Sequence, residues 1–478
     1  MPSRTKSFCI QIDGVMRSEL RGFLKIVLKT LGENFFEILK MEDDDSLLTT
    51  EDNNKEVVEL EVAPALISVH PAHHSIAVAV GCELRVFNLR EGCPVTLGAE
   101  SGEVCHHKDS IRAIRYGAKG KVFVSAGDDK VVKIWNTDSW RCMYSVSTEK
   151  KVSAVAISDD GQFVCYADKF GVVWVVELDE FKENQTLVQK KGLPLLAHYC
   201  SIITSLEFSP DGKFIITADR DFKIRVTVFP KKPLDGAHEI QSYCLGHTEF
   251  VSCLAFVYNM DCPQGYLVSG SGDSTVRLWD FTSGLLLHTC EVGSEVGRLV
   301  ANETENNYFA ITDLCATGDG SSIFVAVQGL PGILLLSCNL SAKTLSVLKV
   351  VSINGEDFIP TSIGTSLTSD FLWMVMGVSN LPGFDSSSLA RVRVISGSTS
   401  CNSESGDENH NILDDKQVPC GEKLLQQLQG SLSIDKDVFS AAAEAVKTSM
   451  RNLLIKKQYS SERREFRKRG RNDRKAKR

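Results

Sequence analysis

Hydrophobic and polar residues alternate in short runs through the middle of the chain, and turn residues separate the runs. Residues 124–135 comprise a run of small and apolar residues, a Gly-Asp-Asp turn, and an alternating run that ends in Trp. Residues 268–279 repeat this arrangement without a gap. Period-two alternation interrupted by Gly and Asp is typical of antiparallel strands joined by tight turns. The pattern therefore predicts an all-β fold built from hairpins.

The hairpin pattern recurs along the chain. The same register fits residues 168–174 and 217–227 and, weakly, 81–87, and the turns fall at 81, 129, 168, 221 and 273, with spacings of 48, 39, 53 and 52. A repeat of roughly 40–45 residues with four short strands resembles the blade of a WD-repeat protein. Residues 62–396 would accommodate seven such blades of about 48 residues, with six as the alternative. We therefore predict a seven-bladed WD40 β-propeller, whose closed ring leaves no exposed sheet edges.

Two of the repeats contain a set of polar residues that WD repeats use as an internal network. Each set has a His before the first strand, a Ser in the second strand, the turn Asp and the Trp: His107, Ser125, Asp129 and Trp135 in one repeat, and His247, Ser269, Asp273 and Trp279 in the other. An unpaired buried polar group costs about 1–3 kcal/mol, so all four members are needed. A third repeat has His198, Thr217 and Asp221 but carries Thr227 in place of Trp. These residues are expected to be structural.

Composition and motifs argue against an enzyme. The chain has 478 residues, of which 43% are hydrophobic and 24% charged, and no run of 18 apolar residues predicts a membrane span. It contains no phosphate-binding Gly-x-x-x-x-Gly-Lys loop, no Gly-x-Ser-x-Gly elbow and no Cys-x-x-Cys pair. Cysteines such as Cys165, Cys253 and Cys315 lie in apolar runs, where a reduced cysteine packs as a small hydrophobe. We expect no catalytic residues, bound metal or cofactor, and a reducing compartment.

One repeat is more particular than a generic WD repeat. Asp219-Arg220-Asp221, Ile224-Arg225, Gly246-His247 and Phe250-Val251-Ser252 resemble the WD-repeat, non-catalytic subunit of tRNA (guanine-N7-)-methyltransferase. The resemblance covers the five recognisable repeats and, loosely, the basic C-terminus. It implies a scaffold subunit that binds a separate Rossmann-like catalytic chain carrying S-adenosylmethionine. That complex would methylate N7 of a guanine in the tRNA variable loop, and the propeller would stabilise the catalytic chain and help to hold the tRNA.

The resemblance also implies which residues contact the catalytic partner. The family contact falls on Arg225, with Lys223 and then Arg220 as neighbouring candidates. The alternative is that a basic residue merely suits this strand position, because the same column holds Arg85, Lys133 and Arg277. The missing Trp and the three cations within six residues favour partner contact.

The two ends of the chain lie outside the repeats. Residues 1–61 are predicted to be a partly disordered N-terminal extension, 397–419 a disordered linker, and 420–478 a helix followed by a basic tail. Residues 456–478 contain 12 Lys and Arg against three acids, a charge of +9, so the other residues sum to −8 − 9 = −17. The basic cluster fits a nuclear import signal, contact with tRNA phosphates, or a solvated tail, and we expect a nuclear protein. Its members are Lys456, Lys457, Arg467, Lys468 and Arg469.

A second function class is a general WD-repeat adaptor, such as a substrate receptor of a ubiquitin ligase. Such receptors commonly carry Arg two residues after a Trp-Asp pair. Here Trp279-Asp280 is followed by Phe281-Thr282. This difference favours the methyltransferase subunit.

Overall fold

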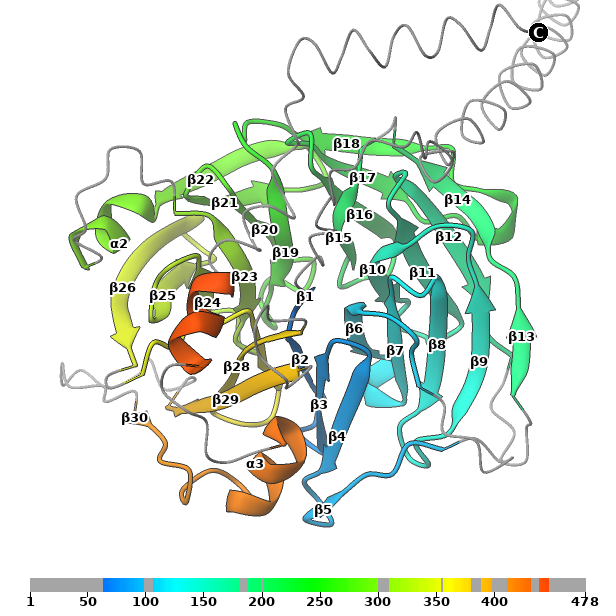
Figure 1. Cartoon of the computed structure of the whole chain (residues 1–478). Coiled ribbons are helices and arrows are strands. Elements are labelled where there is room, and N and C mark those ends of the chain that lie inside the picture. Colours follow the sequence, from blue (N-terminus) through cyan, green and yellow to red (C-terminus); the bar gives the residue numbers. More distant parts are fainter. Residues whose placement is uncertain are drawn as a thin grey trace, which may run out of the picture. The chain divides into compact units, whose positions relative to one another are not determined.

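The protein is a seven-bladed β-propeller. The computed structural model describes residues 63–98, 106–179, 187–198, 201–299, 309–353, 356–379, 388–397, 411–430 and 438–446. Within these ranges the strands form seven sheets, each an antiparallel meander in chain order (Figure 1). The predicted seven blades are confirmed and the six-blade alternative is wrong. The predicted N-terminal extension, residues 1–61, lies outside the described residues.

Each blade contains four strands that run from the inside of the ring outward. Blade one consists of β2 (Leu66–Val69), β3 (Ser75–Val80), β4 (Glu83–Asn88) and β5 (Cys93–Pro94). Blade two consists of β6 (Ile111–Gly117), β7 (Val122–Gly127), β8 (Val131–Asn136) and β9 (Cys142–Ser147). Blade three consists of β10 (Val152–Ile157), β11 (Phe163–Asp168), β12 (Val172–Glu177) and β14 (Leu193–Ala197). Blades four and five consist of β15 (Ile203–Phe208), β16 (Phe214–Asp219), β17 (Ile224–Val228) and β18 (Ile240–Cys244); and β19 (Val251–Val257), β20 (Tyr266–Ser271), β21 (Thr275–Asp280) and β22 (Leu285–Glu291). Blades six and seven consist of β23 (Ile311–Ala316), β24 (Ser322–Val327), β25 (Gly332–Asn339) and β26 (Thr344–Ser352); and β27 (Ser362–Thr365), β28 (Phe371–Ser379), β29 (Ser388–Ser396) and β30 (Asn411–Ile412). An additional strand, β13 (Val188–Lys190), pairs in parallel with β9.

The ring closes through the segment that precedes blade one. Strand β1 (Ala63–Pro64) pairs with β28 of blade seven, and the inner strands β2 and β27 are in contact. The Thr361 hydroxyl reinforces this junction by donating to the Ala65 carbonyl at 2.6 Å. Residues from the start of the propeller therefore complete its last blade, which leaves no open edge at the junction.

Side-chain hydroxyls join successive inner strands by the same contact. Ser153 Oγ donates to the Ile203 carbonyl at 2.7 Å, and Ser252 Oγ donates to the Ile311 carbonyl at 2.6 Å. Thr204 makes the equivalent bond to the Val251 carbonyl. These bonds satisfy carbonyls of the facing strand, so the blades from three to six are aligned around the axis.

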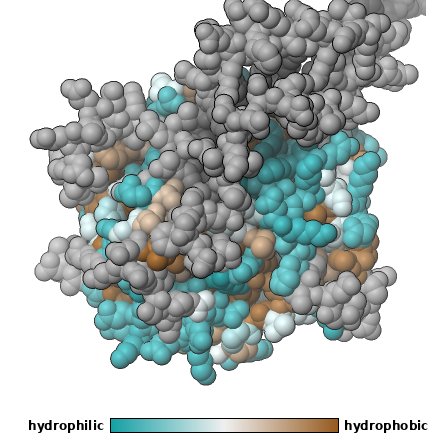
Figure 2. Space-filling model, viewed as in Figure 1, coloured by the Kyte–Doolittle hydropathy of each residue, from teal (hydrophilic) through white to brown (hydrophobic). Residues whose placement is uncertain are grey.

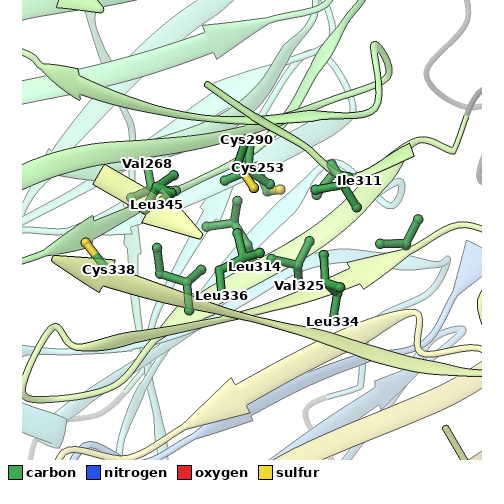
Figure 3. Packing of buried hydrophobic residues seen from close by; sticks show 14 of the residues in the cluster. Cys253, Val268, Cys290, Ile311, Leu314, Val325, Leu334, Leu336, Cys338 and Leu345 are labelled. Carbon is green, nitrogen blue, oxygen red and sulfur yellow. The ribbon is translucent and has the colours of Figure 1, made fainter. Parts of the chain in front are cut away.

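The hydrophobic core lies between neighbouring blades. Between blades five and six, the cysteines Cys253, Cys290 and Cys338 pack with Leu, Ile and Val side chains (Figure 3). Burial raises the pKa of Cys290 to about 11, so it packs as a neutral thiol. The prediction that these cysteines pack as small hydrophobes is confirmed for Cys165 and Cys253, which are buried, and Cys315 is partly buried against the core.

The C-terminal boundary of the propeller was predicted incorrectly. Strand β30 pairs with β29, so blade seven extends beyond residue 396, and Val418 within the predicted disordered linker is buried. Helix α3 (Gly421–Gln429) then packs three leucines against blades one and seven. The helical residues 438–446 bury Phe439 and Val446 in the core of blades six and seven. Apolar residues of 418–446 therefore attach the described part of this C-terminal region to the propeller, including Val418 from the predicted linker.

A further helix, α2 (Gly293–Leu299), follows blade five. No helix in the described part of the chain is both long and apolar enough to cross a membrane.

Candidate partner-binding site on blade four

Blades two and five contain the predicted polar network. In blade two, His107 Nδ1 lies 2.8 Å from Asp129 Oδ2, His107 Nε2 lies 2.8 Å from Ser125 Oγ, and the Trp135 indole donates to Ser125 Oγ at 3.0 Å. The structure brings all four side chains together in one continuous chain of hydrogen bonds.

Blade five repeats this geometry. The corresponding distances are 2.9 Å from His247 to Asp273, 2.7 Å from His247 to Ser269, and 2.8 Å from the Trp279 indole to Ser269. Burial lowers the pKa of His247, which favours the neutral ring. Burial alone would raise the pKa of Asp273, but hydrogen bonds from His247 and Thr275 hold it well below its usual range. The pair is therefore a neutral His held by a carboxylate.

Blade four uses a different Asp from the one the sequence predicted. His198 Nδ1 lies 2.9 Å from Asp219 Oδ2, not from Asp221, and His198 Nε2 lies 2.7 Å from Thr217 Oγ1. The Asp219 carboxylate also accepts the backbone N–H groups of Asp221 and Lys223 at 2.9 and 3.0 Å, and so closes the turn. The assignment to Asp221 was wrong by two residues because both aspartates flank the same turn.

Blade three contains the signal that identifies this arrangement. Asp168 accepts the backbone N–H groups of Phe170 and Val172, at the same spacings of two and four residues. The sequence prediction aligned Asp221 with Asp273 of blade five. Alignment of blade four with blade three instead places Asp219 at the position of Asp168, and so identifies the carboxylate that binds His198.

Arg225 lies on β17, directly opposite Thr217 of β16 and Tyr243 of β18. Its Nε donates to Thr227 Oγ1 at 3.1 Å and its Nη1 donates to the Ala197 carbonyl at 3.1 Å. In blade five, where Trp279 occupies the place of Thr227, Arg277 Nε instead donates to Thr275 at 3.2 Å. The missing Trp therefore lets the Arg225 guanidinium turn toward Thr227, and partial burial lowers its pKa.

The alternative, that a basic residue merely suits this strand position, also has structural support. In blade two, Lys133 Nζ donates to the His106 carbonyl, which corresponds to the contact of Arg225 with Ala197. A cation at this strand position thus binds the carbonyl that precedes the network His. The Lys223 side chain is exposed and makes no bond of this kind. A substitution of Lys223 therefore tests partner contact without breaking a bond within the blade.

The three predicted contact residues share one electrostatic property. Within the described part of the chain, Arg220, Lys223 and Arg225 form no ion pair with a carboxylate, and Asp219 is committed to His198. Three cations that form no ion pair there, with only Asp221 between them in the chain, make this edge of blade four a candidate binding site for an acidic partner.

One feature of this edge was missed by sequence reasoning. Large apolar side chains are exposed beside the cations: Phe222, Tyr243 and Leu245. Figure 2 shows that hydrophilic residues dominate the described surface in that view, with hydrophobic residues in separate patches. An alternation pattern does not reveal which apolar residues stay exposed, because their covering depends on neighbouring blades.

A second cationic cluster lies between blades two and three. Arg112 Nη2, Lys151 Nζ and Lys169 Nζ lie 2.7, 3.2 and 3.6 Å from the Asp128 carboxylate, whose side chain is 2% exposed. Burial alone would raise the pKa of Asp128, but Arg112 and the two lysines hold it below its usual value. Three cations therefore converge on one buried carboxylate. No sequence motif indicated this cluster.

The remaining predicted residues have no counterpart in the site. Lys456, Lys457, Arg467, Lys468 and Arg469 lie outside the described residues. In the ranges that the structure describes, no group of three or more His, Cys, Asp or Glu is placed to hold a metal ion.

Comparison with known proteins assigns the family. The model of the "tRNA methyltransferase TRM82 WD40 domain" matches residues 193–369, from β14 through β27, and a WD-repeat model matches residues 99–136. The tRNA (guanine-N(7)-)-methyltransferase non-catalytic subunit wdr4 of Xenopus laevis is 30% identical over 329 residues, which cover 68% of this chain and 77% of that protein. This chain belongs to the family of these non-catalytic subunits.

Other members are more distant or match over a shorter part. The Dictyostelium discoideum subunit is 26% identical and covers 70% of this chain and 71% of its own length. The human subunit is 34% identical over 186 residues, which cover 39% of this chain and 41% of the human protein. Each of these relatives is named as a non-catalytic subunit, which agrees with the prediction that this chain is not itself the enzyme.

Solved structures are similar in fold alone. "Structure of U3-55K" superposes with a TM-score of 0.51 at 18% identity, covering 66% of this chain and 88% of that one. The WD40 repeats of RRP9 give a TM-score of 0.50 at 18% identity, with coverages of 66% and 87%.

Proposed function

We propose that this chain is the scaffold subunit of a tRNA (guanine-N7-)-methyltransferase. It binds and stabilises the catalytic subunit, which carries S-adenosylmethionine, and helps to position tRNA for m7G formation in the variable loop. The main supporting observation is the set of cations on blade four, Arg220, Lys223 and Arg225, within the segment that matches the family model. Cations without intramolecular carboxylates bind an acidic surface without first breaking an internal ion pair.

The test is co-purification of the C-terminally tagged protein from cells, with Lys223→Glu and Arg225→Glu beside the wild type. Wild type is expected to recover a Rossmann-like methyltransferase and tRNA guanine-N7 activity, and both variants are expected to lose them. Lys213→Glu is the matched control, because Lys213 lies on the same blade, is 73% exposed at its side chain and has the same charge. Recovery of ubiquitin-ligase components without a methyltransferase would favour the adaptor function instead.

The cluster around Asp128 supports the tRNA component of the proposal. Lys151 and Lys169 have side chains that are 37% and 30% exposed, and three cations share the single charge of Asp128, which leaves a net positive cluster that a phosphate can approach. Removal of one phosphate contact lowers the slope of log affinity against log salt by about 0.7–0.9. The double variant Lys151→Ala/Lys169→Ala in the reconstituted complex should therefore lower that slope by about 1–2. An unchanged slope would remove this cluster from the tRNA contact.

The nuclear location remains part of the same proposal. Fusion of residues 456–478 to a fluorescent protein tests it directly, because an import signal acts independently of its context. Nuclear accumulation that disappears when Arg467, Lys468 and Arg469 become alanine is expected. A uniformly distributed fusion would contradict an import role for this segment.

A further inference from the structure

Phe222 occupies a backbone conformation that is unfavourable for its side chain. Its φ is +71°, in the left-handed region, where a bulky residue is an outlier. The equivalent turn position has positive φ in three other blades, where it holds Lys130, Gly171 and Ser274. The turn therefore requires this conformation, and an aromatic residue is a poor choice for it.

The Phe222 side chain is also not buried in the core. It is 39% exposed, so burial in the core does not compensate for the backbone strain. Strained residues that persist in a fold cluster at binding and switch sites. Both the backbone conformation and the exposure of Phe222 thus indicate that its side chain contacts another molecule.

Two more exposed apolar side chains lie at the same edge. The register pairs Ile224 with Cys244 and Arg225 with Tyr243, so the end of β18, which Leu245 follows, lies beside the start of β17. Tyr243 is 43% exposed and Leu245 is 60% exposed. The Phe222–Lys223 turn leads into β17, so this turn and the end of β18 lie at the same end of blade four, whose outermost strand β18 is labelled in Figure 1.

The charges around this apolar edge identify its occupant. Arg220, Lys223 and Arg225 flank it and form no ion pair with a carboxylate among the described residues. A protein surface with an apolar side chain between carboxylates would satisfy both the apolar centre and the cationic rim. This is the usual anatomy of a protein–protein interface, with aromatic residues at the centre and polar residues around them.

We propose that Phe222, Tyr243 and Leu245 form the apolar centre of the docking surface for the catalytic subunit, and that it receives an apolar side chain flanked by carboxylates. This inference rests on the proposed function, and it adds the residues that supply most of the binding energy. The cations at the rim orient the partner, and the apolar centre holds it.

The test is Phe222→Asn, measured as unfolding midpoint in urea and as affinity for the purified catalytic subunit that co-purifies with wild type. Asn tolerates the left-handed conformation far better than Phe, so the unfolding midpoint should rise. The affinity should fall by at least about tenfold, because the aromatic anchor is removed. If Phe222→Asn is more stable than wild type but binds the catalytic subunit more weakly, Phe222 acts in docking. A residue with a purely structural role would lower stability when replaced.

Lys130→Asn is the matched control, since it changes the same turn position in blade two. It should leave the affinity within about twofold of wild type, because blade two lacks the apolar centre. Leu245→Ser is a second variant that does not depend on the turn, and it too should weaken binding by at least about tenfold.

The outcomes distinguish this inference from the proposed function. If Lys223→Glu no longer binds the catalytic subunit while Phe222→Asn and Leu245→Ser bind it as wild type does, the apolar centre is disproved and the scaffold function stands. If wild type itself does not bind the catalytic subunit, both are overturned.

Discussion

Blades four and five share one strand pattern but use it differently. Blade five completes its polar network with Trp279, which is fully buried, and packs Arg277 within the blade. Blade four has Thr227 in the place of Trp, and its Arg225 bonds to Thr227. The turn of blade four is strained at Phe222, and its edge exposes apolar and cationic side chains. A repeat that lacks one member of the structural network can thus carry residues for binding.

The largest expected difference concerns stability. Trp279→Ala should destabilise the propeller by about 3–5 kcal/mol, because it removes a buried aromatic side chain and its bond to Ser269. Thr227→Ala in blade four should cost only about 1 kcal/mol, the value of one hydrogen bond. Urea unfolding of the two variants measures both. Equal decreases would show that blade four is held together as blade five is.

The next difference concerns partner binding. Arg225→Glu should weaken binding of the catalytic subunit by about 2–5 kcal/mol, since it removes a charged contact and adds repulsion. Arg277→Ala in blade five should leave that affinity unchanged. Titration calorimetry with folded variants gives both values. A similar decrease for Arg277→Ala would mean that the partner contact is not confined to blade four.

A smaller effect is expected from pH. The pKa of His247 is lower in the folded state than in the unfolded chain, so its stabilising contribution is present above about pH 6.5 and declines as the pH falls below that value. Between about pH 7.5 and pH 5.5, the free energy of unfolding of wild type should therefore fall more than that of His247→Gln. Unfolding free energies at the two pH values measure the difference. Parallel decreases would contradict the assignment to His247.

The smallest effect tests which Asp belongs to blade four. Asp221→Asn should have the smaller effect on stability, because the carboxylate that binds His198 belongs to Asp219. Asp219→Asn should cost more, because Asp219 binds His198 and two backbone N–H groups of the turn. Thermal unfolding of the two variants is sufficient. The reverse order would restore Asp221 to the network.

Local sequence determined the repeated unit. Period-two alternation, the Gly and Asp turns and the spacing of His, Ser, Asp and Trp predicted seven blades and the networks of blades two and five. These features depend on residues close together in the chain or on a fixed spacing, so they can be recognised without a structure. A local motif, which includes Asp219-Arg220-Asp221 and Ile224-Arg225, likewise pointed to the family that the comparisons then showed.

Tertiary structure decided what depends on distant segments or on nearly equivalent neighbours. Strand β1 closes blade seven, and β30 and α3 extend the propeller past its predicted end, through contacts between segments far apart in the sequence. Asp219 and Asp221 differ by two positions along one turn, and the contact of His198 shows that Asp219 belongs to the network. The exposure of Phe222 likewise depends on which blades lie beside it. Local pattern specifies a blade, whereas packing between blades determines which of its side chains remain available to a partner.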